Sequence, residues 1–402
     1  MKKILAASIN YPDAFNIWGP WNKEANVAIS KIEDITLEVL APRPYTLPFH
    51  WFKYHYFSKI PLIERGIEGK IHHPRFPYLL PKKIFYPLAG DLYSSFIGRY
   101  VRKNIPDIDL IHSHHAYPDG YGLIKVCQKI HCPLVIDIHG PGFFLDWLKQ
   151  PLFQKKVWNF VNNSSKIICI SKKLVSEAVA EGIPEKKLEY IPLGVDFERF
   201  EKTLNSDFPS PLKNEHANKF IFLFVGHLTK RKGLKYLLQA VSLLQENVKN
   251  KCHFVIVGEG PEKVHLIHEA GFLFILNNFT FTGSLDEDKL LKLYLDADVF
   301  VLPSLAEGRP TVINEAMVSE CAILASNVDG IPEQVIDGYN GFLVDPQNPR
   351  QLASKIKQLV EDENLMRTMG KNSKRKIIDE GITWENYAEK INKIYREVLN
   401  SI

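Results

Sequence analysis

Short apolar runs alternate with polar segments of helical period along the whole chain. The apolar runs predict buried strands at 4–9, 37–40, 134–138, 167–170, 220–225, 254–257, 299–302 and 322–325. Between several of them, apolar residues recur at helical spacing, as in 234–244, 289–295 and 352–360. Strands that alternate with helices form parallel sheets covered on both faces. The pattern therefore predicts an α/β fold.

One stretch interrupts this alternation and divides the chain. Residues 201–219 are polar and contain prolines, which is the composition of a linker. A chain of 402 residues is also longer than one hydrophobic core usually supports. We predict an amino-terminal domain at 1–200, a carboxyl-terminal domain at 201–383 and a terminal helix at 384–402. That helix could pack on either domain, including a return to the amino-terminal one.

The overall composition is that of an ordinary globular protein, with 45% hydrophobic and 24% charged residues. No apolar run approaches the ~20 residues that cross a bilayer. The five cysteines are scattered and never have Cys-x-x-Cys spacing, which favours a reducing compartment. The first residues predict a strand better than a signal peptide. We therefore expect a cytoplasmic protein.

Positive charge is concentrated in the first half of the chain. The net charge is +4, but residues 1–200 carry +7 and the remainder −3. Aromatic residues, prolines and bases are dense between 42 and 103. Aromatic rings beside cations are typical of surfaces that bind an anionic membrane or a sugar. The positive charge would also suit an acceptor that carries phosphate. An irregular insertion with a solvated basic surface explains the pattern equally well. The residues that would contact a membrane are Trp51, Phe52, Lys53, Tyr56, Lys82 and Lys83.

The segment 303–317 follows a predicted strand and leads into a helix, the position at which open α/β sheets bind ligands. Gly308 allows close approach of a ligand to the backbone. The helix amino terminus near Thr311 offers free N–H groups to a phosphate. Glu307 and Glu315 lie far enough apart to serve different parts of one long ligand.

This segment resembles the Glu-x7-Glu motif of family 4 glycosyltransferases. Further segments resemble that family in the same order, at 109–114, 135–140, 191–196, 225–233, 257–260 and 297–304. The resemblance implies the GT-B fold, with two Rossmann-like domains facing each other across a cleft. It also implies retaining transfer of a sugar from a nucleotide diphosphate donor. Family membership alone specifies neither the donor sugar nor the acceptor.

The resemblance assigns roles to individual residues. Glu315 would bind the donor ribose and Glu307 the donor sugar. Lys232 would hold the diphosphate and stabilise the leaving group, and His139 would contact the donor sugar. Without the family, Lys232 is better explained as a surface lysine and His139 as a structural residue. The remaining donor-side residues are Gly226, His227, Arg231, Gly308, Arg309, Thr311 and Val312. The acceptor-side residues are Gly19, His114 and Asp119.

Four departures from the family pattern leave alternatives open. His227 stands where an arginine is usual, and Trp18-Gly19-Pro20-Trp21 replaces a Gly-Gly loop. Asp329-Gly330 and Glu320-Cys321 stand where Gly-Gly and Cys-Gly are frequent. One alternative is a sugar-nucleotide-binding assembly protein that has lost transfer; another is a GT-B epimerase or phosphorylase. Retaining hexosyl transfer in cell-surface glycan synthesis is favoured because both glutamates and the lysine persist.

The expected ligands follow from this interpretation. The donor would be a UDP-sugar or a GDP-sugar, and the acceptor a lipid-linked or glycan molecule. Neither a nucleic-acid partner nor a metal is expected. His112, His114 and His115 could in principle bind a metal, but they have the context of a loop. The Asp296-Ala297-Asp298 spacing is better explained as the start of a core strand.

Overall fold

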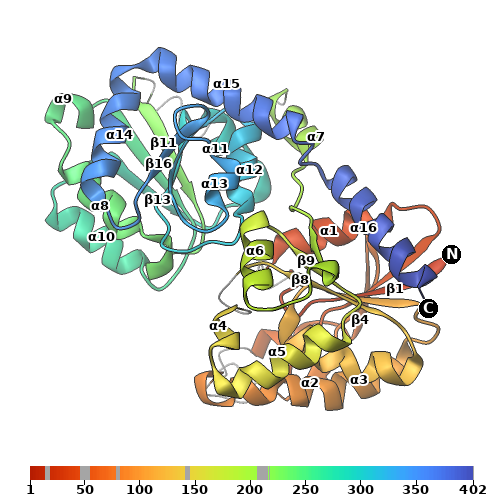
Figure 1. The fold of residues 1–402 in the computed structure, drawn as a ribbon. Helices are drawn as coiled ribbons and strands as arrows, with labels where there is room; N and C mark the ends of the chain where they lie inside the picture. The colour runs from red at the N-terminus through yellow and green to blue at the C-terminus, as the bar shows by residue number, and fades with distance from the viewer. Residues whose placement is uncertain are drawn as a thin grey trace. The chain divides into compact units, whose positions relative to one another are not determined.

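The structure is a computed structural model that describes residues 1–13, 19–45, 55–77, 82–140, 145–205, 216 and 218–401. The chain forms two compact units. Unit 1 contains Met1–Gly194 together with Trp384–Ile402, and unit 2 contains Val195–Thr383. Figure 1 shows that each unit has a central sheet with helices on both faces.

Unit 1 is built on an eight-stranded sheet of order β10-β9-β8-β7-β1-β2-β5-β4. Its strand pairs are parallel except β4 with β5, which are antiparallel. A two-stranded sheet of β3 and β6 accompanies it. The strands are β1 (Lys2–Ala7), β2 (Ile35–Leu40), β3 (Arg43–Pro44), β4 (Ile63–Gly66), β5 (Gly69–His72), β6 (Arg75–Phe76), β7 (Leu110–Ser113), β8 (Leu134–Ile138), β9 (Lys166–Cys169) and β10 (Leu188–Tyr190). The helices are α1 (Pro20–Ser30), α2 (Lys82–Asn104), α3 (Tyr121–Ile130), α4 (Leu145–Leu148), α5 (Pro151–Asn163), α6 (Lys172–Ala180) and α16 (Trp384–Asn400).

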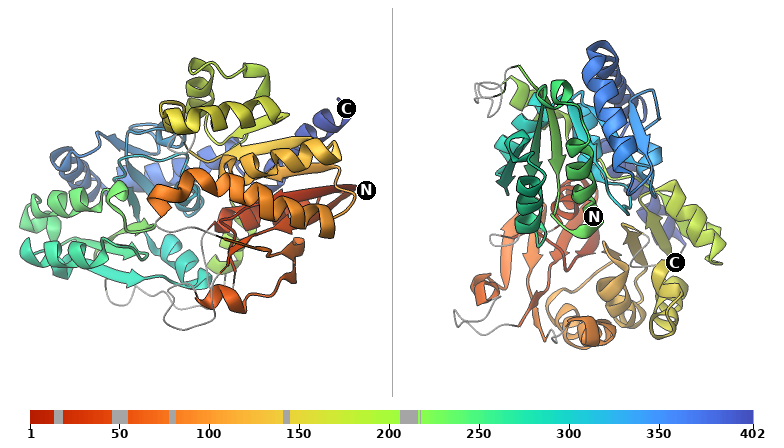
Figure 2. Two further views of the ribbon diagram at one scale, coloured as in Figure 1. Left: turned by 90° about the horizontal axis from the view of Figure 1, so that it is seen from below. Right: turned by 90° about the vertical axis from the view of Figure 1, so that its left-hand side faces the viewer.

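The strands of unit 1 supply two separate cores, one on each face. In β1, Leu5 faces the core that contains α2, α3 and α5, whereas Ile4 and Ala6 face the core that contains α1 and α16. This alternation follows from the period of two along a strand. Figures 1 and 2 show the two helix layers on opposite sides of the sheet.

Helix α16 belongs to unit 1, so of the two placements that the sequence left open the structure shows the return to the amino-terminal domain. Its apolar stripe includes Trp384, Ile391 and Val398, all buried against α1 and the sheet. The stripe repeats with the helical period, so one face of α16 is apolar and the other polar. The last element of the chain therefore completes the core of the first unit.

Unit 2 contains a six-stranded parallel sheet of order β13-β12-β11-β14-β15-β16 and a single large core. Its strands are β11 (Phe220–Val225), β12 (Cys252–Val257), β13 (Phe279–Gly283), β14 (Val299–Leu302), β15 (Ala322–Ser326) and β16 (Gly341–Val344). Its helices are α7 (Phe197–Leu204), α8 (Leu234–Ser242), α9 (Glu246–Lys249), α10 (Lys263–Phe272), α11 (Glu287–Asp296), α12 (Thr311–Val318), α13 (Ile331–Gln334), α14 (Pro349–Glu361) and α15 (Glu363–Asp379).

All eight predicted strands are present, but the division between the domains was misplaced. The prediction ended the first domain at residue 200, which lies inside α7. Phe200 is buried in the core of unit 2, so α7 belongs to unit 2 and the division falls after Gly194. The predicted linker was also drawn too early, because 201–204 are helical; residues 206–215 and 217 lie outside the described part.

Each sheet has one point at which the strand order reverses. In unit 1 the chain moves from β1 to β2 on one side and from β7 to β8 on the other, so the reversal lies between β1 and β7. In unit 2 it lies between β11 and β14. Open α/β sheets bind ligands at the carboxyl ends of the strands at such a point. The loops that follow these four strands are therefore the places to look for a site.

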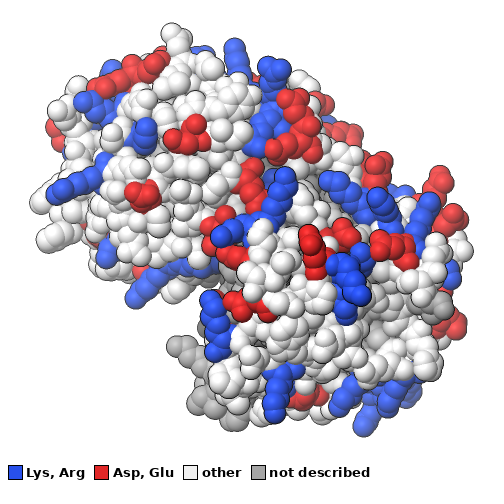
Figure 3. Space-filling view, viewed as in Figure 1, with Lys and Arg blue, Asp and Glu red and all other residues white. Residues whose placement is uncertain are grey.

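No helix in the described residues is both long and apolar enough to span a membrane. On the face drawn in Figure 3, lysine and arginine side chains are interspersed with acidic ones. Of the predicted membrane contacts, Trp51, Phe52 and Lys53 lie outside the described residues, as do the side chains of Lys82 and Lys83. Tyr56 is half-buried against the ring of Phe57.

Candidate functional site

The reversal point of unit 2 holds a buried ion pair. Lys232 ends the short 3-10 helix Lys230–Lys232 in the loop after β11, and Glu307 lies in the loop after β14. The Lys232 Nζ and Glu307 Oε1 atoms are 2.6 Å apart. The two side chains are only 12% and 6% exposed. The sequence singled out both residues, but their pairing across 75 positions was not anticipated.

Two further groups fix Glu307 in place. The Ser304 hydroxyl donates a hydrogen bond of 2.7 Å to the Oε1 atom that Lys232 binds. The backbone N–H of Glu307 donates a bond of 2.7 Å to Asp329 Oδ2, in the loop after β15. Charge-assisted hydrogen bonds of this length are stronger than neutral ones. The carboxylate and backbone of Glu307 are therefore both held before any ligand arrives.

A glycine brings the loops after β11 and β14 together. Gly233 has φ +67°, and a Cβ placed there would lie 1.9 Å from the carbonyl oxygen of Pro303. The N–H of Leu305 also donates to the carbonyl of Arg231 at 2.7 Å. Only glycine accepts both this backbone angle and this proximity. The turn after Lys232 thus positions the lysine against the Glu307 loop.

Helix α12 presents its amino terminus and Glu315 beside these loops. Thr311 and Val312 are its first residues, as predicted, and they provide N–H groups in the first turn. Glu315 accepts a hydrogen bond of 2.6 Å from the Tyr294 hydroxyl. Burial raises the pKa of Tyr294 well above its ordinary value, with Glu315 adding to the effect. Tyr294 therefore remains a donor and holds one Glu315 oxygen.

The other predicted donor-side residues lie at the same edge of the sheet. Arg309 is buried and its Nη1 lies 3.4 Å from Asn314 Oδ1, so it helps to order the start of α12. His227 and Arg231 are exposed in the loop after β11. Gly226 begins that loop and Gly308 adjoins Glu307. Contacts of these five residues with a donor remain predictions.

Unit 1 has a different arrangement, in which two histidines share one buried carboxylate. His112 Nε2 and His114 Nδ1 lie 2.7 and 2.8 Å from the two oxygens of Asp137. His112 Nδ1 is 2.6 Å from the Tyr395 hydroxyl of α16. His112 was expected in a loop, but it lies in β7 on the face of Leu110, towards α16. The network therefore ties the terminal helix to the strand.

Hydrogen-bond geometry and burial set the protonation of this network. Burial alone would raise the pKa of Asp137, but His112 and His114 hold that pKa well below its usual range. Burial lowers the pKa of His114, so its ring is neutral near pH 7. Because Nδ1–H donates to Asp137, Nε2 must accept. The group 2.8 Å away, the amide of Asn26, should therefore present its NH₂ to the ring.

His139 follows β8 and lies next to this network. Burial lowers its pKa to about 4, so the ring is uncharged near pH 7. Its centroid is 5.4 Å from that of His115 and 6.3 Å from that of Trp21. Both ring nitrogens are buried, and a hydrogen bond with the backbone of His114 partly offsets the lowering of the pKa. Such a ring can accept or donate one hydrogen bond to a ligand group.

The predicted acceptor-side residues Gly19 and Asp119 both lie against the segment that follows β1, at the reversal point of unit 1. The N–H of Ile9, after β1, donates a bond of 2.9 Å to Asp119 Oδ2, which fixes the loop after β7 against it. Burial raises the pKa of Asp119 to about 7. Gly19 begins α1 with φ +75°, and a Cβ there would lie 2.0 Å from the Asn10 carbonyl oxygen. Both residues therefore have clear structural roles, and their predicted acceptor contacts remain predictions.

Among the described residues, His112, His114 and Asp137 form the set that could hold a metal. Their facing atoms already hydrogen-bond to one another, and the outer nitrogens face Tyr395 and Asn26. The set is thus complete as a hydrogen-bond network. The Asp296-Ala297-Asp298 segment is structural, since Asp298 Oδ2 accepts the N–H of Ile221 in β11. Metal-independent function remains a prediction.

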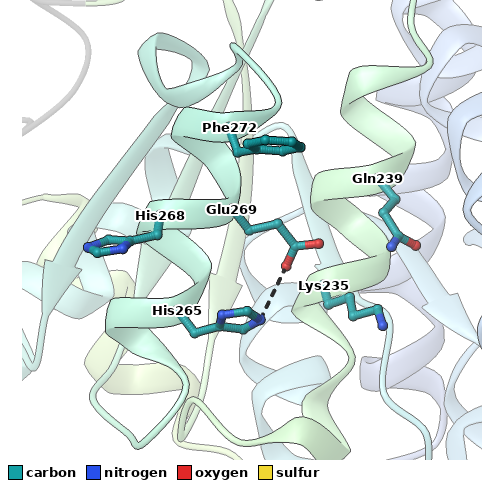
Figure 4. A pocket seen from close by; sticks show the side chains of 6 residues that line it. All are labelled: Lys235, Gln239, His265, His268, Glu269 and Phe272. Carbon is teal, nitrogen blue, oxygen red and sulfur yellow. Dashed lines mark ion pairs between the residues drawn. The ribbon is translucent and has the colours of Figure 1, made fainter.

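A hollow of about 550 Å³ lies elsewhere on unit 2, between α8 and α10. Figure 4 shows Glu269 of α10 facing His265, with Lys235 on the neighbouring helix. The Glu269 and His265 side chains are 3.9 Å apart. The hollow is lined by helix faces rather than by the loops at strand ends. It contains none of the side chains predicted for the donor.

Comparison with known families matches each half of the chain to a different domain model. Residues 38–199 match the model described as Glycosyltransferase Family 4, and residues 209–376 match Glycosyl transferases group 1. An uncharacterized glycosyltransferase of Methanocaldococcus jannaschii is 30% identical over 313 residues, covering 76% of this chain and 81% of that protein.

Two further relatives are described by what they do. A putative teichuronic acid biosynthesis glycosyltransferase of Bacillus subtilis is 26% identical and covers 88% of each chain. The UDP-Gal:alpha-D-GlcNAc-diphosphoundecaprenol alpha-1,3-galactosyltransferase of Escherichia coli is 26% identical, covering 76% of this chain and 79% of that protein. Among solved structures, Anabaena HepE in complex with UDP-glucose covers 100% of both chains with a TM-score of 0.72 and 18% identity.

Proposed function

We propose that this chain, which belongs to the glycosyltransferases of group 1 and family 4, is a retaining hexosyltransferase that uses a nucleotide diphosphate sugar. The chain is a transferase with the GT-B fold, and relatives act in polysaccharide biosynthesis. The observation that carries the finer proposal is the Lys232–Glu307 pair at the reversal point of unit 2. It places a cation and a hydrogen-bond acceptor beside the amino terminus of α12.

In this proposal the nucleotide and the sugar of the donor contact different side chains of unit 2. The diphosphate is held by Lys232 and the first N–H groups of α12, which both favour negative charge. The ribose hydroxyls donate to Glu315, whose position Tyr294 fixes. The sugar hydroxyls donate to Glu307. Lys232 also stabilises the charge that develops on the leaving diphosphate.

The reaction retains the configuration of the anomeric carbon. The acceptor oxygen forms a bond to that carbon as its bond to the diphosphate oxygen breaks, and the acceptor proton passes to the departing phosphate. The relative that converts UDP-Gal into an alpha-1,3 linkage supports this stereochemistry, as well as a lipid-linked acceptor. The HepE complex supports a UDP-sugar over a GDP-sugar donor.

The test is a panel of UDP- and GDP-sugars with and without diphosphate-lipid acceptors, followed by NMR of the product. We expect release of UDP that depends on the acceptor, together with an axial anomeric linkage. An inverted linkage would overturn retention. Binding without turnover would favour an assembly protein, whereas an isomerised donor or phosphorolysis would favour an epimerase or phosphorylase.

We further propose that the protein works at the cytoplasmic face of the membrane and docks reversibly through unit 1. The β4–β5 hairpin exposes Ile63 and Ile67, at 47% and 84%, and Leu62 just before it is 56% exposed. The cations Lys59, before the hairpin, and Arg65, within it, are also exposed. Apolar side chains flanked by cations suit an anionic lipid surface.

Vesicle sedimentation tests this docking. The protein should pellet with anionic vesicles at low salt, and Ile67→Asp should pellet several-fold less. The matched change Leu276→Asp, on the exposed surface of unit 2, should have no effect. Equal pelleting of both variants, or none of the wild type, would refute docking through the hairpin.

A further inference from the structure

We propose that Gln334 is a positioning residue for the donor diphosphate, because its side-chain amide clamps the first turn of α12. This inference rests on the proposed function, in which the N–H groups at the start of α12 bind the diphosphate. Gln334 is the last residue of α13 and is fully buried. A side chain without exposed surface cannot contact a ligand, so Gln334 acts through the backbone that it holds.

The amide of Gln334 joins two points that lie one helical turn apart. Its Nε2 atom is 3.0 Å from the Pro310 carbonyl oxygen and 2.7 Å from Asn314 Oδ1. A carbonyl oxygen can only accept, so the NH₂ group must face Pro310, and it donates one hydrogen to each partner. The Pro310 carbonyl also accepts the N–H of Ile313, which closes the first turn of the helix. Arg309 Nη1 contacts the same Asn314 oxygen at the longer distance of 3.4 Å. The clamp therefore fixes the direction in which the N–H groups of this turn point.

Gln334 ends a segment that contacts the proposed donor-binding stretch at two places. Residues 327–334 follow β15, which pairs with β14. At one end of this segment, Asp329 Oδ2 accepts the backbone N–H of Glu307 at 2.7 Å. At the other end, Gln334 holds the start of α12. The stretch 307–314, which carries the proposed sugar and diphosphate contacts, is therefore held at both of its ends.

A second buried amide holds Gln334 in turn. Asn340 Nδ2 donates to the Gln334 carbonyl at 3.1 Å, and Asn340 Oδ1 accepts the N–H of Ile336 at 2.7 Å. Ser373 of α15 donates to the Asn340 carbonyl at 3.0 Å. Buried networks whose members are hydrogen-bonded in this way are rigid. The position of the first turn of α12 is thus tied to the body of unit 2.

The diphosphate depends on this clamp more than the nucleoside does. N–H groups at the start of a helix bind an anion by pointing at it together. The ribose is bound in our proposal by Glu315, which the Tyr294 hydroxyl holds separately. Loss of the clamp should therefore weaken binding of the phosphates and leave binding of the nucleoside unchanged.

The experiment compares the affinity for UDP with that for uridine, or GDP with guanosine if the donor panel selects GDP. Gln334→Met keeps the length of the side chain but cannot donate a hydrogen bond. Calorimetric titration gives the Kd of the nucleoside diphosphate, and ligand-observed NMR gives that of the nucleoside. We expect Q334M to weaken UDP binding about tenfold, the cost of removing one partner of a buried hydrogen bond, and uridine binding less than about twofold.

Asn278→Leu is the matched control. Asn278 is another buried amide of unit 2, and its Nδ2 atom donates to the carbonyls of Lys249 at 3.0 Å and Cys252 at 3.4 Å. It directly precedes β13, at the edge of the parallel sheet opposite to the site. N278L should therefore lower thermal stability and bind UDP as the wild type does. Glu315→Gln should weaken UDP and uridine together, which shows that the nucleoside assay responds.

Unchanged UDP affinity in Q334M would overturn this inference alone. An equal loss for UDP and uridine would also overturn it, because the effect would then be a general structural defect. If Q334M does not fold, Gln334→Asn is judged by the same criterion, since its amide is one methylene shorter and cannot reach both partners. If the wild type binds no nucleoside diphosphate, the proposed function fails and the inference fails with it.

Discussion

Each unit has a largely parallel sheet with one point at which the strand order reverses, but the side chains that lie at that point differ between the two units. In unit 2 the loops after β11 and β14 meet through a direct ion pair between Lys232 and Glu307. In unit 1 the loops after β1 and β7 meet through a hydrogen bond from the Ile9 N–H to Asp119, and two histidines are bound to Asp137 nearby. Unit 2 therefore has a cation that a ligand can bind, whereas unit 1 has a buried carboxylate that is already held by two histidines.

The difference shows which unit is suited to a charged ligand. A diphosphate can replace Glu307 as the partner of Lys232, so binding exchanges one ion pair for another and avoids leaving a buried charge unpaired. The ring of His139 is neutral near pH 7 and can make one hydrogen bond to a ligand group, whereas the neutral ring of His114 is already bonded at both nitrogens. Unit 1 is therefore better suited to hydroxyl groups, as an acceptor sugar would present. The following predictions test this contrast.

The largest effect is expected from Asp137→Asn. The amide oxygen of asparagine can accept a hydrogen bond from one histidine N–H. The amide NH₂ would face the other histidine N–H and cannot accept a hydrogen bond from it. Unit 1 should therefore lose about 3–5 kcal/mol of stability. Hydrogen exchange measured separately on peptides of each unit checks this. Exchange in α16 and β7 should accelerate while unit 2 is unchanged. The exposed Asp146→Asn should leave both units as in the wild type, and equal loss in both units would contradict the network's local role.

Lys232→Ala should lower kcat about 10²–10³-fold, because the leaving diphosphate loses its cation. It also leaves Glu307 buried without its ion partner, so thermal stability should fall. The double variant K232A/E307Q should recover stability but not turnover. Glu307→Gln alone should bind free UDP more tightly than the wild type, since Lys232 is released from its partner.

The control for this series is Lys235→Ala, an exposed lysine three positions along the chain in α8. It should retain normal kcat. Normal turnover in K232A would show that Lys232 serves only to balance Glu307.

Glu315→Gln should weaken donor binding by about 1.5–3 kcal/mol, the value of a hydrogen bond to a charged group. The amide oxygen can still accept from Tyr294, so folding should be unaffected. Calorimetric titration with the nucleotide diphosphate measures this change, with Glu320→Gln, just after α12, as control. Unchanged affinity would rule out the ribose role.

Asp119→Asn should change the pH dependence of stability. The folded-state pKa of Asp119 is raised to about 7 from 3.8, so the folded state binds the proton more tightly than the unfolded state. Its contribution to stability is full below pH 4 and is lost as pH rises towards 7. The difference in unfolding free energy, D119N minus wild type, should increase from pH 5 to pH 8. A constant difference would show that Asp119 is ionised throughout.

The strands were predictable from the sequence because each is a short buried run with its own turn signals. The helix that begins at Thr311 was expected because its segment follows a predicted strand, as helices do in an α/β fold. Pairings between distant residues were not. His112 and Tyr395 are separated by 283 positions, and nothing in the periodicity of either segment indicates that they meet.

The order of strands in the sheet explains this limit. Lys232 and Glu307 become neighbours because β14 pairs with β11 instead of β13, and a hydrophobic pattern does not encode that order. Lys232 and His139 were found through family resemblance, whereas Glu307 and Glu315 were first singled out by their place after a predicted strand and took their roles from the resemblance. Asp329 was noticed as a departure from the family, but its hydrogen bond to Glu307 required the structure. The predicted domain boundary was misplaced because the polar helix α7 and a polar linker have similar compositions.

The return of α16 to unit 1 has a consequence for synthesis of the chain. Unit 2 is one continuous segment, Val195–Thr383, whereas unit 1 needs residues from both ends of that segment. As the polypeptide leaves the ribosome, the later half can close its core while the earlier half still lacks Trp384, Ile391 and Tyr395. The order of folding is then the reverse of the order of translation. Until α16 emerges, the sheet face that it will cover stays exposed as apolar surface.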